Sequence, residues 1–346
     1  MISEIIKNSA INTKILSMKH SSLSEKEYET MSRLSSVSEV AAFLKTNTRY
    51  SYVLKDIDTS SIHRGVLESL LKGQIKYDIK SILSFSPKSA KFFLKILSTK
   101  EEIDNIKIFL RYLLTENTDS YKRETIFTSP KIFTKLKNTN NFKEFTEALA
   151  DTEYYIALKP FIDFPERQNL FELEMALDRF FSYLCTKYIK KHLSKADAKS
   201  LIQSFGIQSD LDTIMFIMRS KNYYNFSPEQ IYSYINLNFF RLKNQNIKNM
   251  VMANNQKEII NILKITPYKN IFSESLSFFE KNVHKYKLKV NYSLYKKNPH
   301  STEAIQFYIY FKEIEIKNIT TIIEGIRYGL APEEIIKHLI LIKNTD

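Results

Sequence analysis

The sequence predicts an all-α fold, and three observations support this prediction: scarce turn residues, helical spacing of the apolar residues, and helix start signals. Only five glycines and eight prolines occur among the 346 residues. A sheet-rich fold would need many tight turns, and the commonest hairpin turns depend on glycine or asparagine. Long helices joined by short polar links need few such residues, so the composition favours helices.

Apolar residues recur at the spacing of a helix in three separate segments. In residues 316–330 most of them stand three or four positions apart, which places them on one face of a 3.6-residue period. Residues 103–113 and 211–218 show the same spacing. We find no segment with the convincing alternation of apolar and polar residues that is typical of a half-buried strand.

Helix start signals are also frequent. A serine stands three residues before a glutamate or glutamine, the spacing of a capping box, in Ser24 with Glu27, Ser36 with Glu39, and Ser227 with Gln230. Pro228 and Pro332 stand where the first helical residue would be, a position at which a missing N–H costs nothing. These signals predict helix N-termini at the residues concerned.

One short pattern occurs three times along the chain. Each copy has a glutamate followed by an apolar residue, a leucine five positions after the glutamate, and Thr-x-Tyr eight or nine positions after it. The copies contain Glu39, Thr48 and Tyr50, then Glu144, Thr152 and Tyr154, then Glu258, Thr266 and Tyr268. The threonines are 104 and 114 residues apart. We expect each threonine to lie at or just past a helix end, and each tyrosine to pack on its own bundle.

A second pattern recurs later in each unit. It begins with an acid and ends nine residues later in an arginine, in Glu102 with Arg111 and Asp210 with Arg219. In the third copy, which begins at Glu315, Glu324 stands where the arginine would be, so the copies have diverged at that position. We expect a helix to begin near each of the three acids.

The two patterns share their order and a period near 105 residues, which predicts three pseudo-repeated helical bundles. The predicted ranges are an N-terminal helical segment at 1–35 and helical repeats at 36–140, 141–252 and 253–346.

The residue inventory argues against an enzyme. Neither G-x-x-x-x-G-K-[ST] nor G-x-G-x-x-G occurs, so no glycine-rich loop is available to hold phosphate. The six histidines never pair at the i, i+3 or i+4 spacing of two ligands on one helix, and the single Cys185 excludes the usual structural zinc sites. Asp104 and Asp212 each precede an arginine by seven residues, and we interpret them as ion-pair partners rather than acid–base catalysts. We therefore predict no catalytic, cofactor-binding or metal-binding residues.

The formal net charge is +13, and acids are interspersed with lysines along most of the chain, as on solvated helix faces. One basic run differs, because no acid occurs in residues 281–302. Its candidate partner-binding residues are Lys281, Lys285, Lys287, Lys289, Lys296 and Lys297. The run is interpreted as a solvated face, as a contact with an acidic partner or lipid headgroups, or as a nucleic-acid contact. Nucleic acid is not expected, because base readout favours Arg, Asn and Gln.

The sequence also predicts a cytoplasmic protein. Cys185 cannot form a disulfide within the chain, which is typical of a reducing compartment, and its aromatic neighbours predict a core position. Glu4 and polar residues stand where a signal peptide would need an apolar stretch. No apolar run approaches the ~18 residues of a membrane span, so we predict no membrane insertion.

Several segments resemble one known family in order along nearly the whole chain. They are residues 12–19 (Asn-Thr-Lys-Ile-Leu-Ser-Met-Lys), 23–28 (Leu-Ser-Glu-Lys-Glu-Tyr), the first Thr-x-Tyr copy at 36–50, the acidic and aromatic helix at 171–181, and residues 318–335. Together with the length and the triplication, they resemble the C subunit, also called the d subunit, of the V/A-type rotary ATPases. Glu324 departs from the basic residue expected at its position.

This resemblance implies a funnel of three pseudo-symmetric helical bundles. The funnel would lie on the cytoplasmic face of the membrane proteolipid ring, which is built from K/c subunits, and would receive the central shaft of the D and F subunits. The resemblance implies a non-catalytic rotor component of the central stalk, without cofactors, that transmits torque and couples ATP turnover to ion transport. Two alternatives stay open, a helical scaffold for soluble partners and an RNA-binding helical repeat protein. A solenoid would normally have a period of 20–50 residues, which favours compact bundles here.

Overall fold

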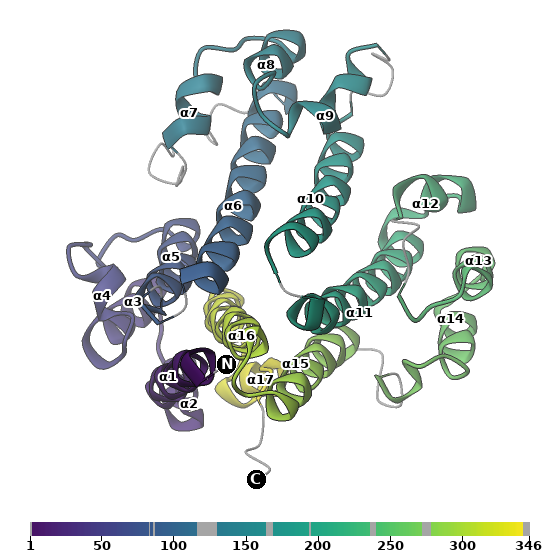
Figure 1. The fold of residues 1–346 in the computed structure, drawn as a ribbon. Helices are drawn as coiled ribbons and strands as arrows, with labels where there is room; N and C mark the ends of the chain where they lie inside the picture. The colour runs from purple at the N-terminus through teal and green to yellow at the C-terminus, as the bar shows by residue number, and fades with distance from the viewer. Residues whose placement is uncertain are drawn as a thin grey trace.

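The computed structural model describes residues 2–82, 84–85, 87–115, 130–163, 169–193, 195–235, 240–271 and 278–341. These residues form helices and no β-strand, so the predicted all-α fold is confirmed (Figure 1). None of the helices in the described ranges combines the length and the apolar character needed to cross a bilayer.

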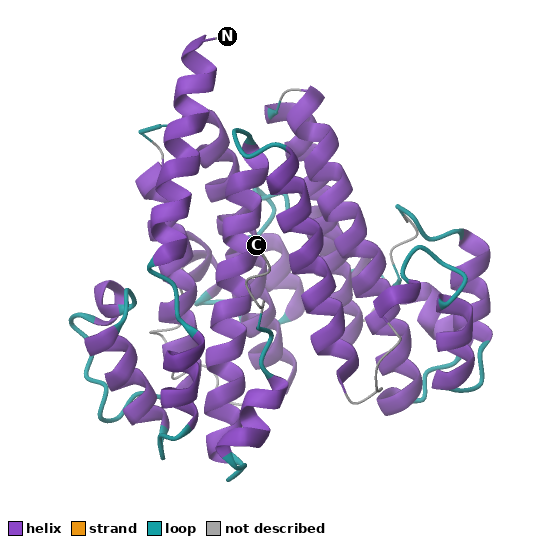
Figure 2. Ribbon diagram, turned by 90° about the horizontal axis from the view of Figure 1, so that it is seen from below, coloured by secondary structure: helices purple, strands orange, loops and turns teal. Residues whose placement is uncertain are grey.

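Long helices build the centre of the described structure. After the N-terminal helix α1 (Ile2–His20) they are α5 (Arg64–Ile82), α6 (Pro87–Thr115), α10 (Leu170–His192), α11 (Lys195–Arg219), α15 (Phe279–Lys297) and α16 (Thr302–Arg327). Each of the last six packs against the next one along the chain, and α16 packs against α5. The contacts of the six long helices therefore close into a ring, with α16 packed inward against α6 and α11 as well, and Figure 2 shows long helices running alongside one another.

Neighbours in this ring run in opposite directions. Residues near the start of α6 and α11 contact residues near the end of α10 and α15, as in Lys95 over the Tyr188 ring and in the Ser204–Asn291 hydrogen bond. At the other end, the start of α5 meets the end of α16 through Arg64 and Glu324. Because the direction alternates around the ring, the α5–α6, α10–α11 and α15–α16 turns all lie at one end.

Short helices complete three groups around the ring. The short helices are α2 (Glu25–Ser32), α3 (Val37–Asn47), α4 (Ser51–Leu54), α7 (Pro130–Leu136), α8 (Phe142–Ala148), α9 (Tyr155–Leu158), α12 (Pro228–Tyr234), α13 (Asn244–Met252), α14 (Gln256–Leu263) and α17 (Pro332–His338). Figure 1 shows α3–α4, α7–α9 and α12–α14 as three separate clusters outside the long helices, while α17 lies against α16. The helices α2 and α3 pack on α16, and α2 also packs on α17. The N-terminal helices α2 and α3 thus form one group with the C-terminal helices α16 and α17.

The helix start signals are confirmed with one difference. Ser24 and Ser227 form full capping boxes, and Pro228 and Pro332 lie in the first turns of α12 and α17. Ser36 accepts the backbone N–H of Glu39 as expected, but the Glu39 carboxylate accepts the N–H of Ser35 instead of that of Ser36. The glutamate half of the capping box is therefore shifted by one residue toward the N-terminus.

The apolar stripe at 316–330 is buried in its first turns. Ile319 and Ile322 are fully buried in a core that also takes in the helices of the first half of the chain. A second core lies between residues 207 and 283. The expectation that helices begin near the second-pattern acids is wrong, because Glu102, Asp210 and Glu315 lie well inside α6, α11 and α16. Their position inside long helices lets each acid face a bundle interior.

Candidate functional site: buried carboxylates and a charged helix ring

Three tyrosine hydroxyls link the two repeated patterns. Each donates a hydrogen bond over 2.5–2.7 Å to one of the three acids, Tyr154 to Glu102, Tyr268 to Asp210 and Tyr50 to Glu315. Every contact joins two of the predicted repeats, and the last joins the beginning of the chain to its end. These contacts agree with a threefold arrangement, while the triplication and the boundaries at 36, 141 and 253 remain predictions.

The threonines fix the turn that carries each tyrosine. Each threonine hydroxyl donates to the carbonyl of a preceding leucine over 2.7 Å, in Thr48 with Leu44, Thr152 with Leu149, and Thr266 with Leu263. The threonines lie at or just past a helix end, as predicted. The three tyrosines are buried. Burial also raises their pKa, so each hydroxyl keeps the proton that it donates.

The glutamates of the first pattern cap helices. The backbone N–H groups of Glu39, Glu144 and Glu258 donate to the side chains of Ser36, Asn141 and Asn255 at the starts of α3, α8 and α14. Their carboxylates accept the N–H of the residue before that cap, which is Ser35, Asn140 or Asn254. A carboxylate at this position also suits the positive end of the helix dipole. The role of these three glutamates in the fold is therefore local.

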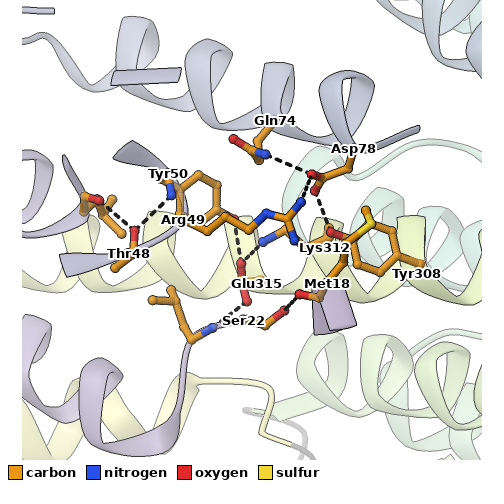
Figure 3. A network of polar contacts seen from close by, with 12 residues as sticks. Met18, Ser22, Thr48, Arg49, Tyr50, Gln74, Asp78, Tyr308, Lys312 and Glu315 are labelled. Atoms are coloured by element: carbon orange, nitrogen blue, oxygen red, sulfur yellow. Dashed lines mark hydrogen bonds and ion pairs between the residues drawn. The ribbon is translucent and has the colours of Figure 1, made fainter. Parts of the chain in front are cut away.

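Glu315 is the centre of a buried polar network between the two ends of the chain (Figure 3). Its carboxylate accepts the Tyr50 hydroxyl at 2.7 Å and the backbone N–H of Leu23 at 2.9 Å, and it pairs with Lys312 one turn earlier in α16. Lys312 and Glu315 are only 1% and 2% exposed. The Lys312 ammonium also lies 4.5 Å from the centre of the Tyr50 ring. Such a pair is stable only when both charges keep their partners.

Asp78 of α5 is a second buried carboxylate in the same network. It accepts from Arg49 and Gln74 at 2.9 Å and from the Tyr308 hydroxyl of α16 at 2.5 Å. Its side chain is fully buried. Asp78 and Glu315 therefore fix the N-terminal helices against α16 from two sides.

Asp210 of α11 holds the loop that leads into α13. It accepts three backbone N–H groups, those of Phe240, Arg241 and Leu242, at 2.7–3.1 Å, in addition to the Tyr268 hydroxyl. All these donors offset the cost of burying the carboxylate. Asp210 thus orients the chain that leads into α13.

Ion pairs join the long helices at the end of the ring opposite the three turns. Arg111 of α6 pairs with Glu174 of α10, and Arg219 of α11 pairs with Glu280 of α15, both at 2.6 Å. Glu324 of α16 pairs with Arg64 of α5. The departure of Glu324 from the repeated pattern is thus compensated by an arginine on the facing helix. The pair is kept and its polarity is reversed.

We expect this compensation to be measurable by a charge swap. Glu324→Arg or Arg64→Glu alone should lower the free energy of unfolding by about 0.5–1 kcal/mol, because like charges then face each other on partly exposed side chains. The double variant should recover most of that loss, as measured by urea unfolding. If the losses of the two single variants simply add in the double variant, the two residues do not act as a pair.

Asp104 and Asp212, the two carboxylates that the sequence indicated as ion-pair partners, have different surroundings. Asp212 pairs with Lys287 at 2.5 Å, and not with Arg219 as its spacing indicated. Asp104 lines a cavity of about 850 Å³ between α5, α6 and α16, and burial raises its pKa. The Lys100–Glu313 pair, at 3.1 Å, links two walls of this cavity. Charges on these walls are thus largely matched by neighbours of opposite sign.

The predicted basic run on α15 does not form one free surface. Lys287 is buried and paired with Asp212, so its assignment as a partner-binding residue is corrected to a structural one. Lys281 donates to the carbonyl of Lys337, and Lys285 is half-buried. The exposed members are Lys289, Lys296 and Lys297. Sequence spacing alone did not separate these two groups, because α15 packs on both α11 and α16.

Two other titratable groups in the interior, Cys185 and His284, are held neutral. Cys185 is buried as predicted, and burial raises the pKa of its thiol to about 12. Burial, followed by the nearby charge of Lys317, lowers the pKa of His284 to about 3, and this ring contacts the Tyr310 hydroxyl at 3.2 Å. In the described ranges, no group of three or more His, Cys, Asp or Glu side chains is placed to hold a metal ion.

The sequence reasoning missed Asp78, Lys312 and Arg64. A signal for Asp78 was present, since it continues the apolar face of α5 that contains Leu71, Ile75 and Ile82. A charged residue on such a face requires a buried partner. Lys312 stands three residues before Glu315, a spacing that places both on one helix face.

Comparisons with known proteins agree with the resemblance found in the sequence. The C subunit of the A-type ATP synthase of Methanocaldococcus jannaschii is 26% identical over 269 residues, which cover 73% of this chain and 66% of that protein. The corresponding protein of Methanosphaera stadtmanae is 24% identical over 334 residues, covering 92% of this chain and 84% of that protein. The family model described as ATP synthase (C/AC39) subunit matches residues 11–338. The chain therefore belongs to the ATP synthase (C/AC39) subunit family, a family of structural and non-catalytic subunits.

Proposed function

We propose that this protein is the non-catalytic central-stalk component of a V/A-type ATPase or ATP synthase. It would join the shaft of the D and F subunits to the membrane proteolipid ring and transmit torque between them. It would act at the cytoplasmic face of the membrane as a peripheral protein. The single observation that carries the proposal is the family match over residues 11–338.

The closed helix ring supports a mechanical role. A part that transmits torque must resist shear between its helices, and close-packed interiors transmit strain. Here the ring is closed by buried charges at Asp78 and Glu315, which tie α16 to the first helices of the chain. An open array of the same helices would end in two exposed helix faces. The closed ring is thus suited to rotation as a single body.

We expect the protein to purify with the rest of the rotary complex. An affinity-tagged chain, recovered from detergent-solubilised membranes, should carry shaft and ring subunits in fixed ratio, and the catalytic head through the shaft. The proposal requires stable contacts, which usually bury more than roughly 1,000 Å². Recovery of soluble proteins alone, with no component of a rotary ATPase, would favour the helical scaffold instead.

A further inference from the structure

Exposed lysines gather at the end of the ring that carries the three turns. The alternating direction of the six long helices places the α5–α6, α10–α11 and α15–α16 turns together at that end. Nine exposed lysines lie no more than four residues from the helix ends that border these turns: Lys80, Lys88, Lys91, Lys190, Lys191, Lys195, Lys199, Lys296 and Lys297. We call this surface the basic end.

The basic end has few compensating acids. The sequence contains no Asp or Glu in residues 79–100 or 281–302 and only Asp197 next to the α10–α11 turn, while Glu153 reaches the last turns of α10 and pairs there with Lys187. Glu303, which follows the second of these ranges, is buried. None of the nine lysines forms an ion pair with another described residue. Much of the net charge of +13 thus lies on one end of the molecule.

The opposite end of the ring differs in its charge. Arg111, Arg219 and Arg64 are each matched there by a glutamate of the facing helix. Paired charges of this kind offer little attraction to an anionic partner. The two ends of the ring therefore present different surfaces, and the basic end is the one suited to anions.

We propose that the basic end binds the anionic headgroups of a phospholipid bilayer. The proposal rests on the proposed function, which brings the protein to a membrane surface, and it assigns the end that faces this surface. Each lysine near an anionic leaflet contributes about 1 kcal/mol, and the attraction falls off within a Debye length. Several lysines on three separate turns therefore suffice for reversible binding without any inserted segment.

The kind of basic side chain favours a bilayer over an acidic protein. The sequence has no arginine in residues 79–100, 187–199 or 281–302, so the basic side chains there are lysines and histidines. Lysines act as point charges and do not need the directional, bidentate geometry that arginine offers to carboxylates. Mobile headgroups suit such charges, because they rearrange around each ammonium group.

The test is co-sedimentation of the purified full-length protein with lipid vesicles. The protein should bind vesicles of phosphatidylcholine mixed with phosphatidylglycerol at low salt, and it should not bind vesicles of phosphatidylcholine alone. Reversing one lysine per turn, in Lys91→Glu, Lys191→Glu and Lys297→Glu together, should weaken binding by more than about tenfold. Raising the salt concentration should release the unmodified protein from the vesicles. This part of the test does not depend on whether a variant folds.

A matched control reverses the same number of charges on short helices. Lys26, Lys248 and Lys257 are exposed on α2, α13 and α14, away from the three turns. Their change to glutamate should leave most of the vesicle binding. Equal losses in both triple variants would overturn the proposal, since net charge and not the basic end would then control binding. Salt-independent binding, or equal binding to both kinds of vesicle, would overturn it as well.

The same variants separate this proposal from the proposed function. If the basic-end variant loses vesicle binding but still assembles into the complex, both proposals stand. If the unmodified protein ignores anionic vesicles while the variant fails to join the isolated proteolipid ring, the partner is an acidic protein surface and the lipid proposal is wrong. If neither variant nor unmodified protein joins the complex, the proposed function fails whatever the vesicles show.

Discussion

Replacing Lys312 with methionine is expected to lower the free energy of unfolding by about 3–5 kcal/mol. The change keeps an unbranched side chain that is one heavy atom shorter, but it leaves the Glu315 carboxylate, which is 2% exposed, without its ion-pair partner. The hydrogen bonds from Tyr50 and Leu23 remain, but they cannot replace the lost charge. Urea unfolding followed by circular dichroism at neutral pH measures the loss.

Two controls make this result specific. Adding Glu315→Gln to Lys312→Met should recover much of the loss, because neither position then buries a charge and the amide oxygen still accepts from Tyr50. Lys72→Met removes an ion pair with Glu68 in which the Lys72 side chain is 59% exposed and the Glu68 side chain is 31% exposed. This change should cost less than about 1 kcal/mol. A loss below about 1 kcal/mol for Lys312→Met would contradict the assignment of Glu315 as a charged, buried centre.

The helices could be predicted from the sequence, but their partners could not. Apolar spacing and capping signals depend on neighbouring residues, so they are visible in one segment at a time. The pairing of Tyr154 with Glu102 cannot be read from the sequence, because Glu102 lies 52 residues after Tyr50 and 52 residues before Tyr154. Sequence distance therefore gives no reason to prefer Tyr154 over Tyr50 as the partner of Glu102. Packing decides that Glu102 and Asp210 each take the tyrosine that follows them, which leaves Tyr50 for Glu315 at the other end of the chain.

Buried charges were the other feature that the sequence concealed. Charged residues are normally exposed, so Lys287 was grouped with its lysine neighbours and Lys312 was passed over. The structure buries both because each has an acid within reach, Asp212 for Lys287 and Glu315 for Lys312. The acid for Lys287 is 75 residues away in sequence, which no local pattern can indicate.

Loss of this protein is expected to abolish ion transport while the ATPase head continues to hydrolyse ATP. The chain carries no phosphate-binding loop, and its family is non-catalytic, so hydrolysis does not depend on its side chains. Under the proposed function it is the mechanical link between shaft and ring. A missing link leaves the shaft free to rotate without moving the ring. The effect on transport is therefore complete, whereas the effect on hydrolysis is small.

The most direct measurement compares ATP hydrolysis and ion-gradient formation in proteoliposomes that contain the complex with and without this protein. The account predicts that the depleted complex hydrolyses ATP but builds no gradient, and that adding back the purified protein restores the gradient. A depleted complex that still pumps at its normal rate, or a purified protein that hydrolyses ATP by itself, would contradict the account.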